Sequence, residues 1–131
     1  MSYNILIVDD SCAMRTVIKR TIGMAELSIG EIYEAGSGKE GLEVLREQWI
    51  DLVLADINMP EMTGIEMTER MQADEEMRNV PVIVVSTEAS ATRIEQLKAQ
   101  GARGYVHKPF TPEQIRDEII RVLAPVAELE S

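Results

Sequence analysis

The sequence predicts an α/β domain with a doubly wound, five-stranded parallel sheet and five helices. Short apolar runs alternate with amphipathic helical patterns, and three of these runs lead directly into charged residues. Alternating strands and helices give a parallel sheet covered on both faces. The most informative stretch is residues 52–60, where an apolar run reaches Asp56 and Pro60 then stops further strand pairing.

The expected strands are short apolar runs bounded by turn formers. The second of them is the weakest, and Pro81 directly precedes the fourth. The five expected strands span residues 3–8, 28–35, 52–56, 82–86 and 104–107.

One helix is expected after each strand. Ser11 and Thr111 are placed to cap the first and last helices, while Gly23 and Gly101 are expected to help end the first and fourth. The second helix opens at residues 37–38, the third spans 65–72 and the fourth spans 91–100. The residues expected to face the core are Met14, Val17, Ile18, Ile22, Leu42, Leu45, Trp49, Ile94, Leu97, Ile115, Ile119, Ile120 and Leu123.

The composition fits one domain over residues 1–124 and a short acidic tail over 125–131. Of the 131 residues, 45% are hydrophobic and 27% are charged, which is enough for a core. The formal net charge of −10 argues against nucleic-acid or anionic-membrane partners, since both need a basic face. The absence of a leader pattern and of a long apolar run predicts a cytoplasmic protein.

The single cysteine, Cys12, excludes an intrachain disulfide and is expected to be a small, mostly buried side chain of the first helix. One cysteine and one histidine, His107, cannot supply the four ligands of a structural zinc site. A metal site in this chain must therefore use oxygen ligands.

Two strands that end in acid supply such ligands. In the strand order 2-1-3-4-5, the crevice lies between the first and third strands, which lead into Asp9-Asp10 and Asp56. Three carboxylates converging within about 4–6 Å would repel one another and raise at least one pKa unless a cation lay between them. Mg²⁺ combines carboxylates with water and phosphate, so the sequence predicts an Mg²⁺ site, with a purely structural acid cluster as the alternative.

A lysine at a neighbouring strand end suits phosphoryl transfer to a carboxylate, because aspartate can form an aspartyl phosphate. Lys108 and Mg²⁺ would neutralise part of the charge on the transferring group. The Ser86 hydroxyl could donate a hydrogen bond to another part of it.

Together these motifs resemble the response-regulator receiver domain family, and within it the stand-alone CheY-like type with its flavodoxin-like fold. The matching stretches cover nearly the whole chain and are residues 9–10, 56–60 with Gly64, 86–89 and 105–110. The resemblance implies two-component signalling, in which a histidine kinase or phosphotransfer domain phosphorylates the protein.

The resemblance also implies roles at the phosphoryl site. Asp56 would be the phosphoacceptor, and Lys108 would pair with its phosphoryl group. Asp9, Asp10 and Asp56, with the backbone carbonyl of Asn58, would hold Mg²⁺.

For signal output, the resemblance implies that Ser86 is the switch hydroxyl and that the Tyr105 ring turns inward when Ser86 moves toward the phosphate. Pro109 resembles the cis-proline of the family. We further hypothesise that Asn58 and Glu88 tune the phosphate lifetime. The readout face would be the fourth helix, fifth strand and fifth helix, including Ala89, Ile94, Tyr105, His107 and Arg121.

Several alternatives stay open. A haloacid-dehalogenase-like phosphatase would need a second aspartate where Asn58 stands, and a flavodoxin-like FMN binder would need an anion loop in place of Asp9-Asp10. Within the receiver family, we expect a weakly associating or monomeric switch protein that catalyses only its own phosphorylation and dephosphorylation. The expected output is chemotaxis through a flagellar-motor switch protein, with a phosphorelay receiver or a fragment of a larger regulator as alternatives.

Overall fold

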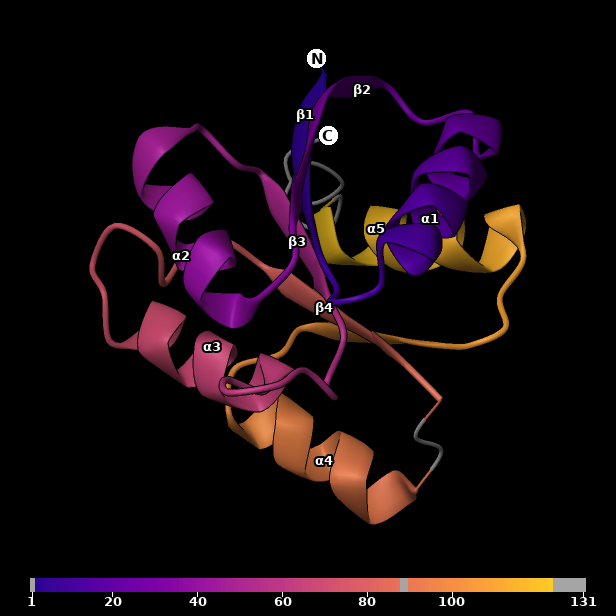
Figure 1. Ribbon diagram of the computed structural model, residues 1–131. Helices are drawn as coiled ribbons and strands as arrows, with labels where there is room; N and C mark the ends of the chain where they lie inside the picture. Colours follow the sequence, from indigo (N-terminus) through magenta and orange to yellow (C-terminus); the bar gives the residue numbers. More distant parts are fainter. Residues whose placement is uncertain (1, 88–89, 124–131) are drawn as a thin grey trace, which may run out of the picture.

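The computed structural model describes residues 2–87 and 90–123, and their strands form one parallel sheet with helices on both faces (Figure 1). The strands lie in the order β2-β1-β3-β4-β5, as predicted. They are β1 (Tyr3–Val8), β2 (Ile29–Ala35), β3 (Leu52–Ala55), β4 (Val82–Ser86) and β5 (Gly104–His107). The helices are α1 (Cys12–Met24), α2 (Gly38–Glu47), α3 (Gly64–Gln72), α4 (Ala91–Ala99) and α5 (Pro112–Leu123). The expected acidic tail over 125–131 lies outside the described residues.

The central strand β3 and its neighbour β1 end at the same level of the sheet. Val8 pairs with Ala55, and the backbone N–H of Asp56 donates to the carbonyl of Val8 at 3.0 Å. Because the strands are parallel, the residues that follow both of them reach the same edge of the sheet.

Alternate strand residues face two separate cores, which is why β3 and β4 are buried along their whole length rather than at every second residue. One core lies under α2 and α3 and contains Met67 and Met71. The other lies under α1 and α5 and contains Ile18 and Ile115. α4 contributes Leu97 to a third and smaller cluster on β4.

The predicted helix caps at Ser11 and Thr111 are confirmed. Ser11 Oγ accepts from the N–H of Met14 at 3.2 Å, and Thr111 Oγ1 accepts from the N–H of Gln114 at 3.1 Å. Gly23, however, does not end α1, which continues through Met24.

Four side chains expected in the core are exposed instead. α2 ends at Glu47, so Trp49 lies beyond the helix, where it is 78% exposed and its Nε1 donates to Asp51. Cys12 is exposed because it is the first residue of α1. Val17 and Ile120 are 49% and 41% exposed, so each lies at the margin of its helix's apolar stripe.

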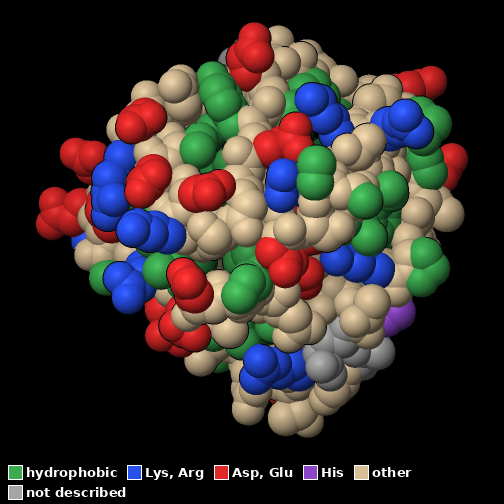
Figure 2. All heavy atoms as spheres, in the orientation of Figure 1, with side chains coloured by type: hydrophobic (Ala, Val, Ile, Leu, Met, Phe, Trp, Pro, Cys, Tyr) green, Lys and Arg blue, Asp and Glu red, His purple; other side chains and the backbone are tan. Residues whose placement is uncertain are grey.

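Acidic and basic side chains are interspersed on the face shown in Figure 2. Within the described residues, no helix combines the length and the apolar character needed to cross a bilayer.

Candidate functional site

Three carboxylates meet at the edge of the sheet where β1 and β3 end. One oxygen of each of Asp9, Asp10 and Asp56 lies within 4.8 Å of the other two. Asp9 is buried, Asp56 is partly buried and Asp10 is exposed. The convergence predicted from the sequence is therefore confirmed, and the cluster opens to solvent on the side of Asp10.

Lys108 reaches this cluster from the end of β5. Its Nζ lies 3.3 Å from Asp9 Oδ2 and 3.5 Å from Asp56 Oδ2, and its side chain is 13% exposed. The peptide bond between Lys108 and Pro109 is cis, as predicted. One mostly buried cation is thus shared between two carboxylates.

The pKa of Asp56 is raised above its ordinary value. Burial is the main cause, and the negative charge of Asp9 adds to it. Lys108 and the N–H of Asn58, which donates to Asp56 Oδ1 at 3.3 Å, act in the opposite direction without cancelling the rise. The site therefore favours proton or cation binding at Asp56.

The loop after β3 is folded tightly against Asp56. The N–H of Gly64 donates to the carbonyl of Ile57 at 3.0 Å, and a Cβ at position 64 would collide with the backbone oxygen of Asp56. Glycine is required at this position because of that approach. The exposed Asn58 lies within the same loop.

Ser86 and Tyr105, two other residues predicted from the sequence, are joined by a hydrogen bond to the backbone carbonyl of Ser86. Ser86 ends β4 and is buried, and its carbonyl accepts from the Lys108 N–H at 2.8 Å and from the Tyr105 hydroxyl at 3.2 Å. The Tyr105 ring is partly buried against the small cluster that contains Leu97. Glu88 and Ala89 lie outside the described residues.

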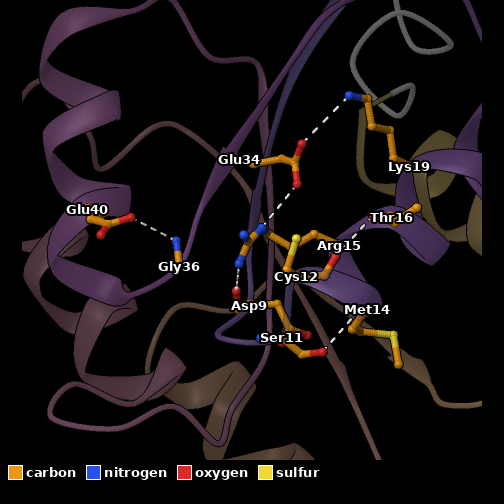
Figure 3. Close-up of polar contacts among 10 residues, drawn as sticks. All are labelled: Asp9, Ser11, Cys12, Met14, Arg15, Thr16, Lys19, Glu34, Gly36 and Glu40. Carbon is orange, nitrogen blue, oxygen red and sulfur yellow. Dashed lines mark hydrogen bonds and ion pairs between the residues drawn. The ribbon is translucent and has the colours of Figure 1, made fainter.

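Ion pairs and a hydrogen bond that the sequence analysis did not predict hold the loop between β1 and α1 in place (Figure 3). Arg15 donates through Nη1 to the carbonyl of Asp9, and its Nε lies 3.1 Å from Glu34 Oε1 on β2. Lys19, one turn further along α1, lies 3.6 Å from the other oxygen of Glu34. The spacing of Arg15 and Lys19 on one helix face, opposite an acid on the adjacent strand, is the signal that could have identified them.

The donor set suits Mg²⁺. All three side chains offer hard oxygen ligands, and their mutual repulsion is only partly offset by Lys108. Asp9 is also held in place, since its Oδ1 accepts from the N–H of Ser11 at 2.8 Å.

A cluster of three carboxylates with one lysine, at the switch point of a doubly wound parallel sheet, defines a class of α/β domains that bind cations and phosphate. The comparison with known proteins narrows this class. Residues 5–120 match the response regulator receiver domain, and the chain belongs to that family.

The chain is similar to chemotaxis protein CheY of Pseudomonas aeruginosa, with 36% identity over 93% of this chain and 97% of the relative. Its fold is similar to that of the chemotaxis response regulator CheY4 of Vibrio cholerae, with a TM-score of 0.84, 32% identity, and 94% and 100% of the two chains covered. It also matches the receiver domain of a sensor histidine kinase from Pseudomonas aeruginosa, with a TM-score of 0.81 and 24% identity, over 94% of this chain and 98% of that one. That receiver domain has a magnesium ion in its active-site cleft.

Proposed function

We propose that this protein is a two-component response regulator in which Asp56 accepts a phosphoryl group from a phosphohistidine of a kinase or phosphotransfer domain. The observation that carries this proposal is the position of Lys108, within 3.5 Å of Asp56 and 3.3 Å of Asp9 in a cluster of three carboxylates. A partly buried acid whose pKa is raised, beside a specific charged partner, is typical of functional sites and supports the proposal.

In the proposed transfer, a carboxylate oxygen of Asp56 attacks phosphorus while the bond between phosphorus and the donor imidazole nitrogen breaks. The imidazole leaves with that electron pair and is protonated from solvent. Charge on the phosphoryl oxygens is then partly neutralised by Lys108. Mg²⁺, held by Asp9, Asp10, Asp56 and the carbonyl of Asn58, would supply further neutralisation.

Phosphorylation would then reshape the face made of α4, β5 and α5. A new phosphoryl group at Asp56 would attract the Ser86 hydroxyl and Lys108. Because Lys108 and Tyr105 already donate to the same Ser86 carbonyl, movement at Ser86 changes the partners of the Tyr105 hydroxyl directly. This shared carbonyl supports Tyr105 as the aromatic switch residue.

The proposed output is chemotaxis through docking on a flagellar-motor switch protein, which the names of the relatives support. The docking face includes a groove of about 540 Å³ between β5 and α5. Its charged lining residues Asp117, Glu118 and Arg121 have a net charge of −1 (+1 − 2). A phosphorelay without a motor target is the alternative output, and in either case the protein acts in the cytoplasm as a switch that catalyses only its own phosphorylation and dephosphorylation.

The test is phosphorylation in vitro. Acetyl phosphate with Mg²⁺ should add the mass of one phosphoryl group to the intact protein, and chelating the metal should prevent the addition. Asp56→Asn should abolish it. Asp117→Asn, which removes an exposed carboxylate that pairs with the neighbouring Arg116, should not. Phosphorylation that survives loss of the Asp56 carboxylate would overturn the proposal.

Asn58 provides a second test, of the phosphate lifetime. Its exposed side chain lies two residues after Asp56, beside the approach of an attacking water. Asn58→Leu should change the rate at which phosphate is lost once the donor has been removed. Equal decay in the variant and the natural protein would exclude a role in setting the lifetime.

A further inference from the structure

The outer edge of β5 is held by two side chains of α5. β5 is the last strand of the sheet, so its backbone pairs with β4 on one side only. On the other side, the N–H of Tyr105 donates to Glu118 Oε2 at 2.8 Å, and the carbonyl of Arg103 accepts from Arg121 Nη2 at 2.9 Å. Side chains of α5 thus take the place that a sixth strand would otherwise occupy.

Glu118 and Arg121 also bind each other. Arg121 Nε lies 2.6 Å from Glu118 Oε1, so the carboxylate uses one oxygen for the arginine and the other for the strand. The Glu118 side chain is only 19% exposed. A surface ion pair alone contributes little to stability, but a shielded carboxylate that accepts a backbone N–H restrains that backbone.

The local sequence is compatible with this contact. A Cβ at position 104 would lie 3.0 Å from Glu118 Oε2 and 3.1 Å from atoms of Ile83 and Val122, so Gly104 leaves room for the carboxylate. Burial alone would raise the pKa of Glu118, but hydrogen bonds from Arg121 and from Tyr105, with the charge of Arg121, lower it overall. The contact is therefore charged at neutral pH.

We propose that Glu118 is a positioning residue for the switch, which holds the backbone of Tyr105 so that its hydroxyl reaches the carbonyl of Ser86. Arg121 orients Glu118. The inference rests on the proposed role of Tyr105, whose amide is fixed by α5 and whose hydroxyl is bound by the end of β4. Any shift of α5 or of Glu118, for example by a partner in the adjoining groove, is therefore transmitted to the aromatic ring.

The first measurement is amide hydrogen exchange on the unphosphorylated protein. In Glu118→Ala, exchange at Tyr105 should be about 10- to 150-fold faster, as expected for loss of one charged hydrogen bond. Glu118→Gln keeps an acceptor but loses the negative charge that pairs with Arg121, so its rate should be intermediate. The matched control is Asp117→Ala, which removes the neighbouring acid of the same groove and should leave exchange at Tyr105 unchanged.

The second measurement follows the ring itself by ¹⁹F NMR of protein containing 3-fluorotyrosine, with the Tyr105 resonance assigned by Tyr105→Phe. Glu118→Ala should shift or broaden this resonance before and after addition of beryllofluoride, whereas Asp117→Ala should not. A purely structural role would lower global stability without a selective effect at Tyr105. If Glu118→Ala does not fold, Glu118→Gln alone provides the test.

Wild-type exchange at Tyr105 and an unchanged ¹⁹F resonance in both Glu118 variants would overturn the inference, as would equal effects in the Asp117→Ala control. Intact-mass measurement of Asp56 phosphorylation in the same variants separates this result from the proposed function. If the variants accept phosphate normally but Tyr105 is unaffected, only the positioning role fails.

Discussion

Replacing Asp56 by asparagine should make the metal-free protein more stable, although it removes the central residue of the site. The carboxylate is 13% exposed and lies in a cluster of like charge. Asparagine has nearly the same shape, and its Oδ1 can still accept from the N–H of Asn58. The substitution therefore removes a charge with little change in packing.

The direct Coulomb energies at Asp56 nearly cancel. With an effective dielectric constant of about 20, repulsion from Asp9 amounts to about 3.5 kcal/mol at the 4.8 Å limit of their separation, and attraction to Lys108 at 3.5 Å to about 4.7 kcal/mol. The exposed Asp10, screened as in water, adds about 0.9 kcal/mol of repulsion. The cost of burying the ionised carboxylate is then the deciding contribution, in agreement with burial as the main cause of its raised pKa.

We expect Asp56→Asn to raise the free energy of unfolding by about 1–2 kcal/mol at neutral pH in the presence of a chelator. A carboxyl whose pKa is raised in the folded state destabilises the fold above that pKa. This destabilisation by Asp56 decreases as the pH falls from the raised pKa toward the ordinary value of 3.8, because the carboxyl becomes protonated. The advantage of asparagine should therefore shrink on acidification.

Urea denaturation with and without Mg²⁺ is the appropriate assay. Saturating Mg²⁺ should stabilise the natural protein by about 2.7 kcal/mol at a concentration one hundred times the dissociation constant, and the variant much less. With Mg²⁺, the natural protein should therefore become more stable than Asp56→Asn. A destabilised Asp56→Asn protein in chelator, or a gain that grows on acidification, would refute the electrostatic reasoning, and Asp117→Asn should show neither effect.

Three further outcomes follow from the structure. Gly64→Ala should lower the free energy of unfolding by about 2 kcal/mol or more in urea denaturation, because the added Cβ collides with the backbone. Gly23→Ala in α1 is the control, because its added Cβ has no neighbouring atom within 4 Å, and it should be neutral or stabilising. The exposed Cys12 should react with a thiol reagent such as DTNB in the native protein as completely as in urea; a thiol that reacts only after unfolding would contradict its placement. Trp49 is 78% exposed and lies at the start of β1, where Asn4 contacts it, at the end of the sheet opposite Asp9, Asp10 and Asp56. Its fluorescence should be quenched readily by acrylamide and should not change when Mg²⁺ is added.

The fold and the centre of the site could be predicted because they follow from local patterns. Buried runs that end in Asp9-Asp10 and Asp56 identify two strands, and the strand order then brings their ends together. Lys108 joins them through the same rule, because it follows the last strand. Each of these inferences needs only the direction and order of the strands.

The errors arose where helical periodicity was extended too far. Trp49 continues the spacing of Leu42 and Leu45, but α2 ends two residues before it and the chain becomes extended. Cys12 and Ile120 carry apolar side chains whose exposure depends on where each helix begins and how it is rotated against the sheet.

Contacts between elements were missed for a different reason. In the sequence, Glu118 has the pattern of a solvent-exposed helix residue. Its carboxylate accepts from the N–H of Tyr105 only because α5 lies along the open edge of β5, which the sequence does not indicate. The bond from Arg15 to Asp9 likewise depends on how α1 lies over β2.

Helix α4 is attached to the rest of the domain more lightly than its neighbours. It buries only Leu97, whereas α3 buries Gly64, Met67, Thr68 and Met71. Displacing α4 therefore leaves the two large cores intact and costs little apolar burial. By moving α4, such a domain can present different binding surfaces to different partner proteins while the rest of its fold stays the same.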